Sequence, residues 1–224
     1  MVEELLEKER KVSELEKEKH KLELEKIISQ KEKIQYQYAF LRAQINPHFL
    51  YNTLNVLYSQ ALSLSENMAE NIMKVSELMR YSLDNLEMEN MKIPVHKEIK
   101  HLEILLSIYR LRYADSIYYE METSGIEEGH YIPPLSLITV VENVFKYGDL
   151  SSQNHPMLLS IDYREDCLVF ICKNKKKKNY TNAISHNIGL SNLKQRLDFA
   201  FQNKYHIDIQ NDDNFYMFKL KIFK

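Results

Sequence analysis

The N-terminal stretch constrains the fold most, because it contains nothing that breaks a helix. Residues 1–40 have neither Pro nor Gly and are dense in Glu and Lys. Apolar residues recur at heptad spacing in two phases that change near Leu24, first Leu5, Val12, Leu15 and Leu22, then Ile27, Ile34 and Leu41. This pattern predicts a coiled-coil helix over residues 1–40, with one slip in register. A single solvated helix is the alternative.

The composition fits a folded core beside such a helix. The chain has 224 residues, of which 44% are hydrophobic and 28% charged, so one or two domains are expected. The net charge of −2 argues against a protein that binds nucleic acid directly by bulk charge.

The cysteines and the hydropathy pattern bear on location. Cys167 and Cys172 lie five residues apart in a strand-like run, hence on opposite faces, and cannot easily form a disulfide. We therefore expect a reducing, cytoplasmic compartment. No run of about 18 apolar residues is present, so the sequence predicts no membrane span.

One histidine lies in a helical, amphipathic stretch. Residues 45–55 read Ile-Asn-Pro-His-Phe-Leu-Tyr-Asn-Thr-Leu-Asn, and Pro47 directly before His48 should kink or restart the helix. Asn52 follows one turn later, where its side-chain oxygen can accept from one ring nitrogen and leave the other with a free lone pair. A neutral histidine of this kind is a nucleophile. A partly buried helix histidine with a structural partner is the alternative.

The rest of the chain predicts helices followed by mixed strands and helices, an α+β class. Helices are expected over 65–88, 98–113 and 189–202, with another that opens at Pro133-Pro134 and a linker over 89–95. Strands are expected over 117–122, in a hairpin of 157–163 with 167–172, and in a final hairpin of 204–210 with 215–223. Gly125 and Gly129 mark a loop.

Residues 141–148 form the end of a helix with a pattern suited to phosphate chemistry. Glu142, Asn143 and Lys146 share a face at one-turn spacing. An Asn oxygen can hold Mg²⁺ together with substrate phosphates, and a lysine can neutralise a transferred phosphoryl group. The alternative is a surface lysine followed by Gly148 in a left-handed cap. Gly189 opens another helix, whose backbone N–H groups can bind phosphate. The basic run of Lys173 and residues 175–178 is either a solvated loop or a cationic cover for a triphosphate.

Residues 46–55 resemble the phosphoacceptor motif of the LytS-like sensor histidine kinases, Asn-Pro-His-Phe-(Leu)-(Phe/Tyr)-Asn-x-Leu-Asn. The resemblance implies that His48 takes the γ-phosphoryl group of ATP. Phe49 stands where other histidine kinases have an acidic residue, so no adjacent carboxylate serves as base. Arg80-Tyr81-Ser82-Leu83 is similar to the family's Arg-Tyr-x-Leu.

Two further segments carry the resemblance into the nucleotide site. Residues 142–148 resemble the N box, which implies that Asn143 is the Mg²⁺ ligand, Glu142 the acidic catalytic residue beside it and Lys146 a phosphate contact, with Tyr147 in place of the usual histidine. Residues 188–197 resemble the family's second glycine box, which implies nucleotide contacts by Gly189, Leu190 and Arg196. Asn187 replaces the first glycine of that box, and the Asp-x-Gly-x-Gly segment is missing. Asn174 stands near the place of that Asp, where its amide oxygen can accept one hydrogen bond from adenine.

Taken together, the resemblance implies three parts: the coiled coil over 1–40, a dimerisation and phosphoacceptor hairpin over 41–92, and a Bergerat-type (GHKL) ATP-binding α/β sandwich over 93–224. It implies a homodimeric histidine kinase that uses Mg-ATP and passes the phosphoryl group to a response regulator of the DNA-binding type. It also implies that the chain can be the cytoplasmic part of a membrane-anchored sensor. Because the lid glycines and the adenine-reading Asp are absent, a dimeric pseudokinase or interaction module is the alternative, and a coiled-coil scaffold is the third reading.

Overall fold

The computed structural model describes residues 47–84, 92–114, 116–177 and 186–224, together with the helical positions 7, 11, 17–22, 26 and 29. Most of the predicted coiled coil therefore lies outside the described residues. The chain divides into two units, Met1–Asn52 and Thr53–Lys224, and the second holds the sheet and its helices. No described helix has both the length and the apolar character needed to cross a bilayer.

Two helices joined by a short turn precede the sheet in the chain. Helix α2 spans Pro47–Leu62 and helix α3 spans Glu66–Asp84. The Ser65 hydroxyl accepts from the Met68 N–H at 3.3 Å, so Ser65 caps α3. The turn is closed by N–H groups of Leu64 and Ser65 that donate to the Ala61 carbonyl.

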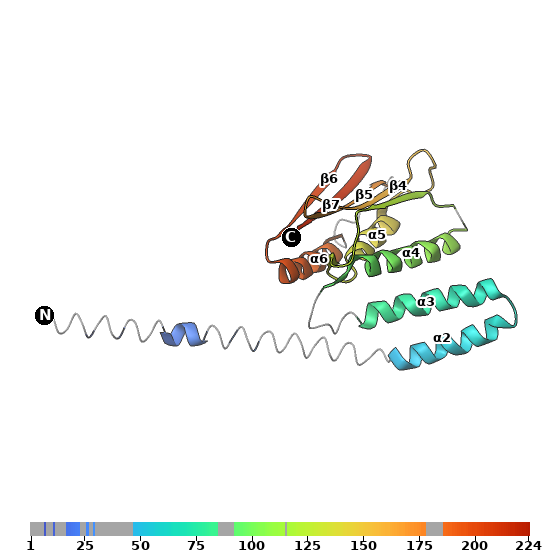
Figure 1. Ribbon diagram of the computed structural model, residues 1–224, viewed down its shortest axis with the longest axis horizontal. Coiled ribbons are helices and arrows are strands. Elements are labelled where there is room, and N and C mark those ends of the chain that lie inside the picture. Colours follow the sequence, from blue (N-terminus) through green and yellow to red (C-terminus); the bar gives the residue numbers. More distant parts are fainter. Residues whose placement is uncertain are drawn as a thin grey trace. The chain divides into compact units, whose positions relative to one another are not determined.

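The core of the second unit is a five-stranded sheet with helices on one face (Figure 1). The strand order is β2-β4-β5-β7-β6, from Tyr119–Ser124, Met157–Arg164, Cys167–Lys175, Phe215–Phe223 and Tyr205–Asn211 respectively. Only β2 and β4 pair in parallel. The helices beside the sheet are α4 (Val95–Arg112), α5 (Ser136–Tyr147) and α6 (His186–Phe201). The predicted helices followed by an α/β sandwich are confirmed.

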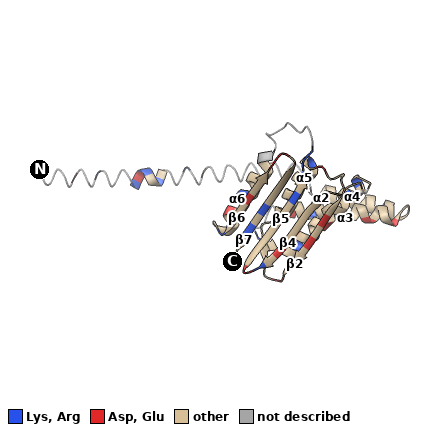
Figure 2. Cartoon of the chain, turned by 90° about the horizontal axis from the view of Figure 1, so that it is seen from above, with Lys and Arg blue, Asp and Glu red and all other residues tan. Residues whose placement is uncertain are grey.

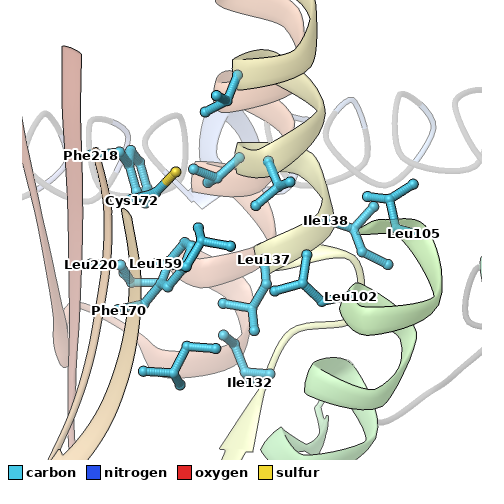
Figure 3. Close-up of a cluster of buried hydrophobic side chains, with 14 of the residues drawn as sticks. Leu102, Leu105, Ile132, Leu137, Ile138, Leu159, Phe170, Cys172, Phe218 and Leu220 are labelled. Carbon is cyan, nitrogen blue, oxygen red and sulfur yellow. The ribbon is translucent and has the colours of Figure 1, made fainter. Parts of the chain in front are cut away.

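The core lies between the sheet and these helices. Figure 3 shows Leu137 of α5 and Leu102 of α4 on the side toward sheet residues such as Phe170, whereas Leu105 of α4 and Ile138 of α5 lie beside each other between the two helices. Along β7, Phe218, Leu220 and Ile222 are buried and alternate with Lys219 and Lys221. The opposite face of the sheet therefore carries charged side chains, and Figure 2 colours the charged residues along the strands.

Both predicted hairpins are confirmed, and the backbone of the β4–β5 turn explains the first of them. Glu165 and Asp166 have φ of 52° and 57°, which gives β4 and β5 a two-residue connection with the twist that hairpins need. Gly125 has φ of 65°, and a Cβ there would lie 2.2 Å from the Tyr163 carbonyl oxygen, so the loop requires glycine.

The region before α4 corrects the sequence prediction. Residues 93 and 94, placed in a linker, form the short strand β1 (Ile93–Pro94), which pairs with β3 (Tyr131–Ile132). Helix α4 begins at Val95, three residues earlier than predicted, because Pro94 occupies its N-cap and presets an extended backbone there. The earlier start places Glu98 inside the helix, where its side chain is fully buried.

Candidate functional site

His48 lies exposed in the first turn of α2. Asn52 contacts it one turn later, within the same unit, as the spacing predicted. The Asn52 Nδ2 atom is 3.2 Å from His48 Nδ1 and 3.4 Å from Nε2. The imidazole is thus both open to a partner and oriented by a neighbouring amide.

The direction of this contact differs from the prediction. The Asn52 amide nitrogen, not its oxygen, faces the ring, so Asn52 donates and the ring accepts. A ring nitrogen that accepts a hydrogen bond has its lone pair engaged. Half a turn of the amide about its terminal torsion would bring the oxygen to Nδ1–H and free the lone pair of Nε2.

The nucleotide-site candidates gather around α5. Asn143 is half-buried, and its Nδ2 has no hydrogen-bond partner among the described residues. Gly189 of α6 faces it: a Cβ on Gly189 would lie 3.8 Å from Asn143 Nδ2, 3.9 Å from Oδ1 and 3.4 Å from Thr139 Cγ2. Helices α5 and α6, which are distant in sequence, thus approach each other at the Asn143 side-chain amide. Helix α6 begins at His186, so Gly189 is in its first turn rather than at its start, a correction to the predicted boundary.

Asn174 lies at the end of β5 beside the end of α5. It is only 3% exposed, its Nδ2 donates to the Lys175 carbonyl at 2.8 Å, and its Oδ1 has no partner in the described part of the chain. A Cβ on Gly148 would lie 2.7 Å from Asn174 Nδ2. Gly148 has φ of −86° and ψ of 147°, so it is not the predicted left-handed cap. Glycine is required here by close packing on Asn174, not by a positive φ.

The described residues of the basic run contact other segments, which corrects the prediction of a solvated loop, whereas the cationic cover stays a prediction. Lys175 pairs with Asp149 at 3.3 Å, and the Lys176 ammonium donates to Asn211 and to the Asp212 carbonyl. Lys177 donates to the carbonyls of Phe145 and Lys146, the last turn of α5, where a cation is favoured. Lys173 lies 5.3 Å from the centre of the Phe215 ring. Residue 178 is outside the described residues.

The remaining predicted site residues spread over α5 and α6. Lys146 is exposed, and Glu142, Tyr147 and Leu190 are half-buried. Burial and the nearby Glu142 carboxylate raise the pKa of Tyr109 on α4. The Arg196 guanidinium donates to Thr139 Oγ1 at 3.2 Å and to the Leu135 carbonyl at 3.5 Å, so it holds α6 to the start of α5. The catalytic and nucleotide-binding roles of these residues stay predictions.

Sequence reasoning missed Glu98, which forms the centre of a buried network. Its Oε2 accepts from the Leu135 N–H at 3.0 Å and its Oε1 from the Leu137 N–H at 3.1 Å, so a residue of α4 caps α5. The Tyr81 hydroxyl of α3 also donates to Oε2. Burial raises the pKa of Glu98 to about 7, while the backbone N–H groups and Arg196 lower it. In sequence, Glu98 looks like any polar position of an amphipathic helix.

The residues around α5 are suited to bind an anionic ligand as a complex with a metal cation. Within the described ranges, no three His, Cys, Asp or Glu side chains come together as a metal site. Mg²⁺ commonly uses one or two protein ligands and completes its shell with phosphates and water. The buried Asn143 Nδ2 has no partner in the described part of the chain, and as a donor it can bind a phosphate oxygen, while Oδ1 of the same side chain is the atom that can take Mg²⁺.

Comparison with known proteins bears on this geometry. Residues 36–117 match the family model of histidine kinases. The chain is 28% identical over 188 residues to the sensor protein LytS of Oceanobacillus iheyensis, an alignment that covers 77% of this chain and 32% of that protein. It is 26% identical over 136 residues to the sensor protein kinase HptS of Staphylococcus aureus strain USA300, covering 60% of this chain and 25% of that protein. The chain therefore spans about a third of the length of LytS and less of HptS.

A solved catalytic domain of the histidine kinase ThkA aligns with 61% of this chain and 99% of its own length, at 14% identity and a TM-score of 0.46. The fold observed here and the family match define the class, a histidine kinase core with a Bergerat-type sandwich. Within that class, the relatives that the chain matches are the sensor proteins LytS and HptS.

Proposed function

We propose that the chain is the kinase core of a two-component sensor, which phosphorylates His48 from Mg-ATP and passes the phosphoryl group to an aspartate of a response regulator. One observation carries this proposal: the unpaired Asn143 amide, the close approach of Gly189 and the buried Asn174 lie around a single helix, α5. Phosphoryl transfer needs mainly the positioning of the reactants and the neutralisation of charge. We expect these groups to position the nucleotide.

The residues divide the work as follows. Asn143 would hold Mg²⁺ through its side-chain oxygen, and the ion would supply neutralisation of the phosphate charge. The exposed Lys146 ammonium would lie against phosphate oxygens, and the free Oδ1 of Asn174 would accept from the exocyclic amine of adenine. Glu142, Tyr147, Leu190 and Arg196 complete the proposed nucleotide site, Glu142 as the acidic residue beside Asn143.

The nucleophile is His48. It is exposed, and it is the one histidine with a proline directly before it and an Asn one turn later. Several large apolar side chains of α2 and α3 are also exposed, among them Val56, Leu62 and Met68 at 57%, 50% and 55%. We propose that a second copy covers them in a homodimer and that the domain boundaries are those predicted above. A cytoplasmic location, a membrane-anchored parent and a response regulator of the DNA-binding type belong to the same proposal.

Acid lability tests the reaction. A phosphoramidate is labile in acid and stable in base, unlike a serine ester. Incubation with labelled Mg-ATP should give acid-labile label in the wild-type chain, none in His48→Gln and a strong loss in Asn143→Ala. His206→Gln is the matched control, because His206 lies exposed on the edge strand β6, and it should keep its label. Label that survives His48→Gln would refute the mechanism. A wild-type chain that dimerises but takes no label would be a pseudokinase.

A further inference from the structure

The start of α5 is a junction of three other helices. Glu98 of α4 accepts from the N–H groups of Leu135 and Leu137, and Ile138 donates to it at 3.5 Å. Arg196 of α6 binds the same turn through the Leu135 carbonyl and Thr139. Helix α3 reaches the junction through the Tyr81 hydroxyl, which donates to Glu98 and lies 3.5 Å from the Leu135 nitrogen.

The backbone at this junction is strained. Leu135 has φ of 60° and ψ of 17°, the left-handed region, which costs a non-glycine residue about 1 kcal/mol or more. Such a conformation persists only where its surroundings hold it. Here the Leu135 N–H is bound by Glu98 and its carbonyl accepts from the Thr139 hydroxyl at 2.5 Å and from Arg196. The position of α5 therefore depends on the network that fixes Leu135.

Tyr81 is itself fixed in place. It is 7% exposed and its ring stacks on His101 of α4 at a centroid distance of 3.7 Å. A movement of α3 along or about its axis would carry the hydroxyl away from Glu98. Because a helix moves nearly as a rigid body, a shift at Leu135 would also move Asn143, two turns further along α5.

We propose that Tyr81 and Glu98 are positioning residues that couple helix α3 to the nucleotide-binding helix α5. When Tyr81 donates to Glu98, the carboxylate caps α5 and Asn143 stands at its place. When α3 withdraws Tyr81, the cap weakens, Leu135 relaxes and Asn143 is displaced. The nucleotide part of this inference rests on the proposed function, whereas the coupling of the helices does not.

Hydrogen exchange of the nucleotide-free full chain tests the coupling directly. Tyr81→Phe removes the hydroxyl and keeps the ring, so amides 135–139 should exchange about tenfold faster, the effect of losing one hydrogen bond to a charged group. Exchange in β5 should not change. Glu98→Gln should have the same local effect. Tyr205→Phe is the matched control, because its hydroxyl also donates to a carboxylate, Asp198 at 2.6 Å, away from α5.

A second measurement separates the two proposals. In Tyr81→Phe the affinity for Mg-ATP should fall several-fold, as judged by calorimetry, while Tyr205→Phe binds as the wild type does. Unchanged exchange at 135–139, or an equal acceleration throughout the sheet, would overturn the coupling and leave Tyr81 a merely structural residue. A wild-type chain that binds no Mg-ATP would overturn the proposed function, and the exchange result would still decide the coupling.

Discussion

Gly189 and Asn143 lie so close that a single methyl group on Gly189 would sit 3.8 Å from the Asn143 amide nitrogen. That distance is an ordinary van der Waals contact, so alanine fits without a clash. It would nevertheless cover the amide that we assign to the Mg²⁺-nucleotide complex. A substitution at Gly189 can therefore change the stability of helix α6 and the affinity for the nucleotide in opposite directions.

Gly189→Ala should raise stability and lower nucleotide affinity. Alanine in a helix is favoured over glycine by about 0.5–1 kcal/mol, so the free energy of unfolding should rise by about that amount. Affinity for Mg-ATP should fall at the same time, as measured by calorimetry. Gln195→Ala on the exposed face of α6 controls for helix propensity and should leave binding unchanged. Equal affinity of Gly189→Ala and the wild type would remove Asn143 from the site.

Asn174→Asp should strengthen adenine binding and weaken the fold. A carboxylate accepts a hydrogen bond from the adenine amine more strongly than an amide does. At 3% exposure, however, the charge is desolvated, so we expect a loss of about 1–3 kcal/mol in the free energy of unfolding at neutral pH. Calorimetry with Mg-ATP and urea unfolding measure the two effects. Asn174→Ala should bind Mg-ATP more weakly than the wild type and Asn174→Asp. If Asn174→Ala binds more tightly than Asn174→Asp, adenine does not contact residue 174.

Substitutions of Asn52 should reveal whether its side chain acts on His48 as a hydrogen-bond donor or as an acceptor. Asn52→Asp has only acceptors, so it fixes the proton on Nδ1 and frees Nε2 of His48, and labelling from Mg-ATP should be at least as fast as in the wild type. Asn52→Ala should be slower by about tenfold, because nothing selects the tautomer. Asn71→Ala removes a similar one-turn contact, with Asn67 at 3.3 Å, and should have no effect. If the Asp variant is as slow as Ala, acceptance of a ring proton is not the role of residue 52.

The buried carboxyl of Glu98 should give the protein a pH-dependent stability of unusual sign. Its pKa is raised from 4.5 to about 7, so the folded chain keeps a proton that the unfolded chain has lost in this range. The free energy of unfolding should therefore fall as the pH rises from about 4.5 to about 7, by up to about 3 kcal/mol from this group. Tyr81, His101 and Arg196 are the titratable or charged groups around it.

Urea unfolding at pH 5 and pH 8 measures this dependence. Glu98→Gln carries no proton to lose, so the difference between the two pH values should shrink in that variant, while His101→Gln should keep it. Equal differences in the wild type and Glu98→Gln would show that the carboxyl is ionised throughout.

The strands were predictable because local chemistry determines them. Alternation in residues 157–163 and 167–172, with Arg164 to Asp166 between them, specifies a hairpin whatever lies around it. The same holds for the final hairpin. The motif around His48 also predicted its contact with Asn52, although not which amide atom makes it.

The parts that failed depend on distant partners. Glu98 is charged and lies in a helix, and only the approach of Tyr81 and of the α5 N-terminus makes its burial favourable. The lysine run looks solvated in sequence, but Lys175 and Lys177 find an acid and helix carbonyls on other segments. Gly148 suggested a helix cap, whereas the close approach of Asn174 is what demands glycine. Each of these contacts joins residues from different elements of the fold.

The order of strands has a consequence for how the second unit folds. The β4–β5 and β6–β7 hairpins pair neighbours in sequence, whereas β5–β7 joins strands with α6 and β6 between them. Closing a long segment costs chain entropy before any contact is gained, so the two hairpins should form first and their union at β5–β7 should limit the rate. Because α5 packs against β5, the nucleotide helix becomes anchored only in that late step. Pulse-labelled exchange during refolding should find the β4–β5 amides protected before those between β5 and β7.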